Sequence, residues 1–170
     1  MPPRGLRIRA SWDQETTTTV TVLRTLTRRA LQLAEEAAGH EEEILRIVRA
    51  RRPDLLTQRG VGPIVAATIL CAWSHPGRVH SEAAFAMLAG TAPIPATSGQ
   101  TVNRHRLNRY GDRQLNRALH VIVLSRLRYD DCTRAYADRP ISEGKTRREV
   151  IRCLKRYVAR DLYRLLEHHP

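Results

Sequence analysis

The sequence predicts an all-α protein, and three observations support that fold class. Hydrophobic residues recur at alternating spacings of three and four, which is the period of a helix that buries one face. No segment sustains the alternation of apolar and polar residues that is typical of a half-exposed strand. Residues that begin or end helices stand at the edges of the periodic segments. We therefore expect a long amphipathic, coiled-coil-like helix followed by a compact helical domain, which carries a helix-hairpin-helix-like corner and a long basic loop.

The N-terminal part of the chain changes character near residue 20. Residues 1–19 show no sustained periodicity, and we predict a flexible segment there. Residues 20–58 have a helical pattern, and Arg51, Arg52 and Pro53 are expected to end the long helix. The apolar stripe of this helix fits the seam of a coiled coil, and it fits equally a single amphipathic helix packed on its own domain. The stripe comprises Leu23, Leu26, Ala30, Leu33, Ala37, His40, Ile44 and Ile47.

The compact domain is predicted over residues 59–170. Residues that favour the start of a helix precede each of its apolar segments, either as side-chain caps or, for proline, because the first helical position needs no N–H. A long loop is predicted over residues 91–110, and any strand in the chain would be a short hairpin there. A polar stretch, Asp130 to Gly144, precedes the last helix. The expected helix-starting residues are Pro63, Ser81, Asp112 and Thr146, the last in a capping box with Glu149.

Positive charge is concentrated in the C-terminal part of the chain. The net charge is +12, and residues 101–170 carry 17 basic and 8 acidic side chains. Lys145 and Lys155 are the only lysines, and all other basic residues of this segment are arginines, whose guanidinium groups pair bidentately with phosphate. This pattern indicates polyanion binding, although a solvated basic surface would have the same composition. The aromatic content of 5% argues against a surface that stacks on bases.

The first candidate site is the segment that contains Arg59, Gly60 and Gly62. Two glycines separated by one residue allow the backbone to turn sharply and to present N–H groups at a helix N-terminus, where a DNA phosphate can bind. The segment is similar to the hairpin of helix-hairpin-helix modules. A plain helix-turn-helix corner that needs glycine for tight packing is the alternative, and the sequence gives the two equal weight.

The second candidate site is Ser98, which precedes a glycine in the long loop. A serine nucleophile must lose its proton as it attacks, and positive charge must neutralise the phosphoryl oxygens. On residue pattern alone, a Ser-Gly pair in a loop is more often a turn. The basic residues that follow it and that are expected to bind nucleic acid are Arg104, Arg106, Arg109, Arg113 and Arg117.

Other sites and locations are predicted to be absent. His105 and His120 are isolated, and the acidic residues form no cluster for two-metal phosphoryl transfer, so we predict no metal site. The three cysteines are widely spaced, which argues against a disulfide framework, and Cys71 is expected to be a core thiol. No segment is apolar enough to span a bilayer and no signal peptide follows Met1, so we expect no membrane association and a cytoplasmic location.

Four ordered blocks of the sequence carry a family resemblance. They read RGVGPIVAATIL, AWSHPGRVHSEAAFAMLAGTAPIPATSGQT, LNRYGDRQLNRALH and GKTRREVIRCLKRYVARDLYRLL. Through them, residues 60–166 resemble the C-terminal transposase domain of the bridge-RNA-guided insertion-sequence transposases, the IS116/IS110/IS902 group. The resemblance implies a DNA transposase or recombinase domain with DNA and bridge RNA as partners, at the nucleoid of a bacterial cell. The preceding helix fits the family's linking coiled coil, which implies a homo-oligomer.

The resemblance also implies a division of the active site. In this family a serine of the C-terminal domain is thought to form a covalent phosphoserine link to the cleaved strand, and its position is that of Ser98. An N-terminal RuvC-like domain carries the acidic magnesium site, and 170 residues leave no room for it. We therefore expect no cofactor in this chain, and we expect the chain to bind nucleic acid without completing recombination. It is then either a truncated fragment or half of an enzyme whose other half is a second polypeptide.

Two further interpretations remain open. The chain fits a non-catalytic, helix-hairpin-helix-like nucleic-acid-binding module, in which the glycine corner and the arginines of the loop grip phosphates. It also fits a coiled-coil dimerisation fragment whose positive charge is incidental.

Overall fold

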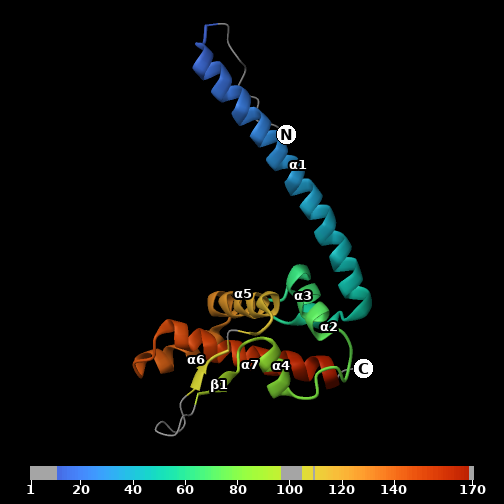
Figure 1. Ribbon diagram of the computed structural model, residues 1–170, viewed down its shortest axis with the longest axis vertical. Coiled ribbons are helices and arrows are strands. Elements are labelled where there is room, and N and C mark those ends of the chain that lie inside the picture. Colours follow the sequence, from blue (N-terminus) through green and yellow to red (C-terminus); the bar gives the residue numbers. More distant parts are fainter. Residues whose placement is uncertain (1–10, 97–104, 109, 169–170) are drawn as a thin grey trace. The chain divides into compact units, whose positions relative to one another are not determined.

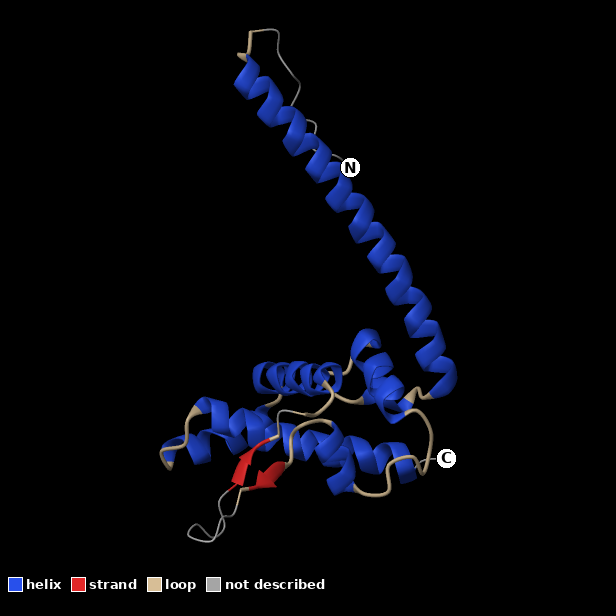
Figure 2. Ribbon diagram, in the orientation of Figure 1, coloured by secondary structure: helices blue, strands red, loops and turns tan. Residues whose placement is uncertain are grey.

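The computed structural model describes residues 11–96, 105–108 and 110–168, and most of these residues are helical (Figures 1 and 2). The all-α class is thus confirmed. The only strands in the described ranges form a two-stranded antiparallel hairpin with Pro93 opposite Leu107, within the loop where a hairpin was expected. The elements in chain order are α1 (Gln14–Arg51), α2 (Asp54–Thr57), α3 (Pro63–Trp73), α4 (Glu82–Leu88), β1 (Pro93–Pro95), β2 (His105–Leu107), α5 (Arg113–Tyr129), α6 (Asp131–Ser142) and α7 (Arg147–His168).

The chain consists of two compact units, residues 1–43 and residues 44–170. The first contains most of α1, which begins at Gln14, earlier than the expected start at residue 20. The side chain of Asp13 accepts a hydrogen bond from the backbone N–H of Thr16 at 2.9 Å, which caps the helix. The threonine hydroxyls of the first turns donate to carbonyls four residues earlier, as for Thr18 to Gln14 at 2.8 Å. These local bonds satisfy the hydroxyls of threonines, which have little helix propensity of their own.

The apolar stripe of α1 is exposed over much of its length. The exposed fraction is 49% for Leu23, 60% for Leu26 and 47% for Leu33. Near the end of the helix, Ile44 and Val48 pack into the hydrophobic core of the second unit. The coiled coil therefore stays a prediction for the part of the stripe before residue 44.

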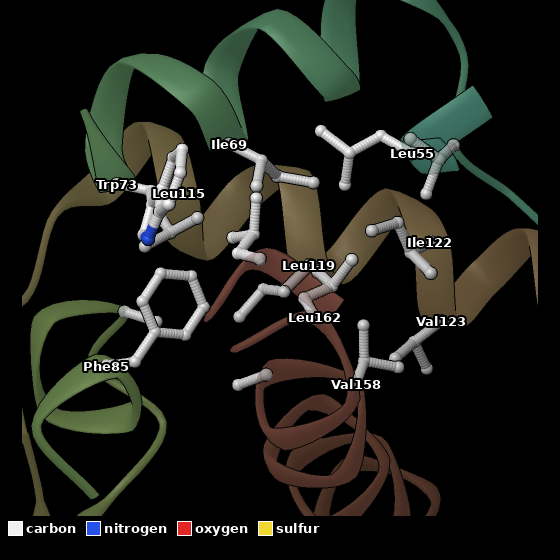
Figure 3. Close-up of a cluster of buried hydrophobic side chains, with 14 of the residues drawn as sticks. Leu55, Ile69, Trp73, Phe85, Leu115, Leu119, Ile122, Val123, Val158 and Leu162 are labelled. Carbon is white, nitrogen blue, oxygen red and sulfur yellow. The ribbon is translucent and has the colours of Figure 1, made fainter. Parts of the chain in front are cut away.

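Helix α5 lies at the centre of the second unit. Helix α3 packs against it, α7 packs against it from another side, and α4 packs on α7 (Figure 1). The buried face of α5 contains Leu115, Leu119 and Ile122, at the helical spacing that the sequence predicted, and Phe85 and Leu162 complete the cluster (Figure 3). Full burial of each such side chain stabilises the fold by about 1.5–3 kcal/mol. This core holds α4, α5 and α7 together, which are the helices that surround the long loop.

Arg52 fastens the C-terminal end of α7 to the end of α1. Its guanidinium donates to the carbonyl oxygens of Leu165 at 2.7 Å and Leu166 at 2.9 Å, and its Nε donates to Asp54 at 2.9 Å. The guanidinium carbon also lies 5.6 Å from the centroid of the Trp73 ring. A cation at the end of a helix satisfies carbonyls that have no partner within the helix. The hydrogen bond from Arg52 is also the largest cause that lowers the pKa of the Asp54 carboxyl.

The predicted helix starts are confirmed. Pro63 is at the start of α3, and the Ser81 hydroxyl accepts from Ala84 N at 3.1 Å. Asp112 accepts from two backbone N–H groups at the start of α5, at 2.8 and 2.9 Å. Thr146 and Glu149 exchange the hydrogen bonds of a capping box. The described helices include none that is both long enough and apolar enough to cross a membrane.

Two expectations differ from the structure. The polar stretch after Asp130 contains α6, because the Asp130 carboxylate accepts from Thr133 N at 3.0 Å and Ala137 is buried against the core. Cys71 is exposed and is not a core thiol. The core face of α3 contains Ile69 and Trp73, and a residue two positions after Ile69 points to the opposite side of a helix.

Candidate nucleic-acid interface

Three of the predicted site residues, Ser98, Arg104 and Arg109, lie outside the described residues. The structure therefore tests the other predicted positions and shows how the rest of the domain surrounds the two ends of the long loop. The described site residues are Arg59, Gly60, Gly62, Arg106, Arg113 and Arg117.

The glycine corner has one glycine that is needed for packing and one that is open. Gly60 has a φ of +86°, and a Cβ atom there would lie 3.1 Å from the carbonyl oxygen of Ile122 and from the Cβ of Ser125. Its backbone thus packs closely on α5, as the helix-turn-helix alternative expects. Gly62 has an ordinary φ of −92°, precedes the first turn of α3, and would have no neighbour within 4 Å of a Cβ atom. The open side of the corner is therefore at Gly62.

Arg59 is engaged within the protein. Its Nη1 lies 2.7 Å from a carboxylate oxygen of Asp130 and 3.2 Å from the carbonyl oxygen of Tyr129, and its own carbonyl accepts from Arg126 Nε at 3.0 Å. These bonds fasten the corner to the junction of α5 and α6. The Arg59 side chain is still 59% exposed, so a phosphate could reach it, in competition with Asp130.

Two glycines bring the ends of the long loop together. A Cβ atom on Gly111 would lie 2.3 Å from the backbone nitrogen of Gly90, a distance that no side chain tolerates. Gly90 has a φ of +64° at the end of α4, a conformation that glycine adopts readily. The backbone N–H of Asp112 donates to the carbonyl of Leu88 at 2.7 Å. The loop of residues 91–110 thus leaves and rejoins the domain at one point.

Two asparagine side chains also form hydrogen bonds to the C-terminal end of α4, beside the contact of the two glycines. Asn108 Nδ2 donates to the carbonyl of Met87 at 3.0 Å, and Asn116 Nδ2 donates to the carbonyl of Ala89 at 2.6 Å. Both bonds satisfy carbonyls at the C-terminal end of α4. Neither asparagine was predicted from the sequence, in which the only signal was their position near the glycines that flank the loop.

A basic cavity of about 430 Å³ opens beside this point, between α5 and α7. Its lining includes four basic side chains and no acidic one: Arg113, Arg117 and His120 of α5 and Lys155 of α7. Asn108, Asn116 and the two glycines complete the wall. The sequence predicted Arg113 and Arg117 as part of the interface, but it did not identify Lys155 as a site residue. Lys155 is half-buried, because α7 lies against α5.

A second basic cavity, of about 230 Å³, adjoins the first. It is lined by Pro93 of the loop and by Arg152, Lys155 and Arg156 of α7, so Lys155 belongs to both. Arg106 is exposed on β2, where the loop returns to the domain. Together these residues form a basic surface around the root of the loop, which we call the loop-root surface: Arg106, Arg113, Arg117, His120, Arg152, Lys155 and Arg156.

The described part of the chain contains no group of three His, Cys, Asp or Glu side chains that could hold a metal ion. His120 lies in the basic cavity, among cations rather than carboxylates. The chemistry available at the loop-root surface is therefore the binding of anions by guanidinium, ammonium and imidazole groups.

Comparison with known proteins gives a specific match for this part of the chain. Residues 53–138 match the family described as "Transposase IS116/IS110/IS902 family". The chain is 32% identical over 116 residues to "Insertion element IS900 uncharacterized 42 kDa protein" of Mycobacterium paratuberculosis. This match covers 68% of this chain and 29% of the relative. It is 29% identical over 134 residues to "Insertion element IS110 uncharacterized 43.6 kDa protein" of Streptomyces coelicolor. This second match covers 78% of this chain and 33% of the relative. The chain thus matches about a third of the length of these curated relatives.

Proposed function

The chain belongs to the IS116/IS110/IS902 family of transposases, and on that basis we propose that it binds DNA at the loop-root surface and supplies Ser98 as a nucleophile for strand cleavage. The observation that carries the proposal is the place of the loop in the domain. The residues that connect to Ser98 on both sides leave the domain at Gly90 and Gly111, and basic side chains of α5 and α7 surround that point. A phosphodiester that reaches the loop therefore meets positive charge beside it.

The proposed chemistry is a phosphoryl transfer to serine. The Oγ of Ser98 gives up its proton and forms a bond to phosphorus, while the bond from phosphorus to one strand oxygen breaks. That oxygen takes up a proton and leaves as the hydroxyl of the strand end, so no proton is gained or lost overall. Negative charge then develops on the phosphoryl oxygens, and guanidinium groups stabilise it most when they are already in place. Arg104 and Arg109 follow Ser98 in the sequence, and Arg106, Arg113 and Arg117 belong to the loop-root surface.

A trapped covalent intermediate tests this proposal. The full chain is mixed with a RuvC-like domain of a relative, its bridge RNA and a target that contains a nick, so that the cleaved strand cannot be rejoined. We expect a protein–DNA adduct that survives denaturing electrophoresis, and we expect Ser98→Ala to abolish it while DNA affinity changes less than about twofold. Thr97→Ala removes the neighbouring hydroxyl and should leave the adduct intact. An adduct that persists in Ser98→Ala rejects Ser98 as the nucleophile.

Bridge RNA and the full recombination reaction are part of the same proposal. Guanidinium groups that bind a phosphodiester backbone do not by themselves distinguish RNA from DNA, so the loop-root surface is compatible with either. The magnesium site of the family is assigned to the RuvC-like domain, which this proposal expects to act together with the present chain. The matched relatives are about three times as long as the matched segment.

A non-catalytic nucleic-acid-binding module is the second candidate function, and the open N-terminus of α3 at Gly62 favours it. Backbone N–H groups at such an end bind phosphate irrespective of sequence. This candidate predicts DNA binding without any adduct, for the wild type as well as for Ser98→Ala.

A further inference from the structure

Lys155 is a half-buried cation without a carboxylate partner among the described residues. Its Nζ atom donates a hydrogen bond to the side-chain oxygen of Asn116, which is a neutral group. Burial is the largest cause that lowers the pKa of this ammonium group, and the charge of Arg152 lowers it further. The charged form of a buried lysine is thus disfavoured by its surroundings in the protein alone, and an anion nearby would reverse that effect.

Three other cations of the same unit are paired with carboxylates. Arg52 pairs with Asp54, Arg59 with Asp130 at 2.7 Å, and Arg164 with Glu82 at 2.5 Å. By contrast, the 430 Å³ cavity beside Lys155 contains three further basic side chains and no acidic one. Arg113 and Arg117 are exposed and form no ion pair within the described part of the chain. Positive charge thus lines this cavity with no carboxylate in the lining to balance it, and an anion from outside the protein would supply the missing partner.

We propose that this cavity is a binding site for one phosphate group, held by the ammonium of Lys155 and by the guanidinium groups of Arg113 and Arg117. The ammonium has three hydrogens, and Asn116 accepts one of them, so two are left for phosphate oxygens. Asn116 is itself held by its bond to the carbonyl of Ala89, so it positions the ammonium relative to the loop root. The glycines at the loop root add no side chain to the wall, which leaves room for the anion.

The phosphate comes from a nucleic-acid backbone or from free phosphate, and these sources share the same chemistry. The nucleic-acid source rests on the proposed function, whereas affinity for a phosphate group does not. The site would hold the backbone at the root of the loop and so fix the position of the phosphodiester that is offered to the loop.

The two lysines of the chain allow a direct test. With the ε-carbons of lysine labelled, the protein gives one NMR signal for Lys155 and one for Lys145, which is exposed just before α7. The full chain is titrated with inorganic phosphate, and separately with a short single-stranded oligonucleotide, at constant ionic strength maintained with chloride. We expect the signal of Lys155 to shift and to saturate with both, and the signal of Lys145 to stay within the change that chloride causes. Equal shifts of the two signals, or no shift of Lys155 with either ligand, overturn the proposal.

Two matched variants give a second readout. Lys155→Gln and Lys145→Gln remove the same charge, from the cavity and from an exposed turn. We expect Lys155→Gln to weaken oligonucleotide binding roughly tenfold, and to reduce the slope of log affinity against log salt by about 0.7, the value for one phosphate contact on a single strand. Lys145→Gln should stay within about twofold of the wild type. Equal losses in both variants would show a general charge effect and no site at Lys155.

The outcomes separate this proposal from the proposed function. If the oligonucleotide binds while the Lys155 signal stays still and Lys155→Gln binds normally, the phosphate site is wrong and the proposed function stands. If inorganic phosphate shifts the Lys155 signal while no oligonucleotide binds, the site is a free-phosphate site and the proposed function falls. Lys155→Arg is a further variant that keeps the positive charge. Thermal unfolding followed by circular dichroism checks that each variant is folded.

Discussion

At the scale of single residues, the backbone at Gly90 and the backbone at Gly111 lie in close contact. Both glycines are needed because the backbone of the end of α4 touches the backbone just before α5. This contact decides where the loop that contains Ser98 begins and ends. A change at either glycine should therefore affect both stability and nucleic-acid binding.

We predict that Gly111→Ala destabilises the domain by about 1–3 kcal/mol, because the added Cβ would lie 2.3 Å from Gly90 N and the two backbones must separate. The affinity for an oligonucleotide should also fall in this variant, since the cations around the loop root would no longer be held close together. Chemical denaturation and a binding titration measure the two effects. Gly62→Ala is the control, because a Cβ there has no neighbour within 4 Å, and it should cost less than about 1 kcal/mol. A Gly111→Ala variant as stable as Gly62→Ala would contradict the close packing.

Some residue roles could be predicted from the sequence and others could not. The capping roles of Ser81 and Asp112 depend on neighbours within three positions, so local pattern was sufficient to identify them. The pairing of Arg59 with Asp130 joins residues 71 positions apart. Local pattern contains no information on such a contact, so the sequence predicted no partner within the protein for Arg59.

At the scale of elements, the long helices were predictable and the short polar one was not. The apolar face of α5 repeats at helical spacing over 17 residues, which is long enough to distinguish a helix from other structures. Helix α6 has few apolar residues and contains Pro140, so its sequence resembles a loop. It is helical because Asp130 caps it and Ala137 packs on the core, and the second of these depends on tertiary contacts.

The exposed stripe of α1 carries a prediction at this scale. If α1 forms a coiled coil with a second copy, Leu26→Glu should weaken self-association at least about tenfold, because it places a charge at a seam position. Leu31→Glu makes the same change at an apolar residue outside the stripe, which is 53% exposed, and should leave association unchanged. Analytical ultracentrifugation measures both. A wild-type chain that stays monomeric at high concentration, or equal effects of the two variants, would reject the coiled coil.

At the scale of the whole molecule, the uneven charge makes nucleic-acid affinity dependent on salt. Each phosphate that the protein neutralises releases bound counterions, and log affinity for duplex DNA falls by about 0.9 per contact for each unit of log salt. With about four contacts at the loop-root surface, a roughly fourfold rise in salt should weaken binding on the order of 100-fold. Fluorescence anisotropy at several salt concentrations measures the slope. A flat dependence would contradict both the transposase proposal and the binding-module candidate.

The basic character of the interface was predictable from composition, whereas its geometry was not. Arg113 and Arg117 lie one turn apart on a helix whose start was evident, so their common side could be inferred. Lys155 joins them only because α7 packs along α5, which brings it to Asn116 across 39 positions. The order of helices in space is decided by the core, and a single sequence does not reveal it.

Because Gly90 and Gly111 are in contact, we expect that the loop of residues 91–110 can be replaced. Both of its ends are held at one place by the backbone contact, and Asn116 bonds the carbonyl of Ala89 beside it, so we expect the helical body to depend little on how many residues lie between them. The entropic cost of a longer closed loop grows only slowly with its length. A loop of another length or sequence could therefore be grafted between the two glycines, and the same body would present a different reactive segment to the nucleic acid it holds.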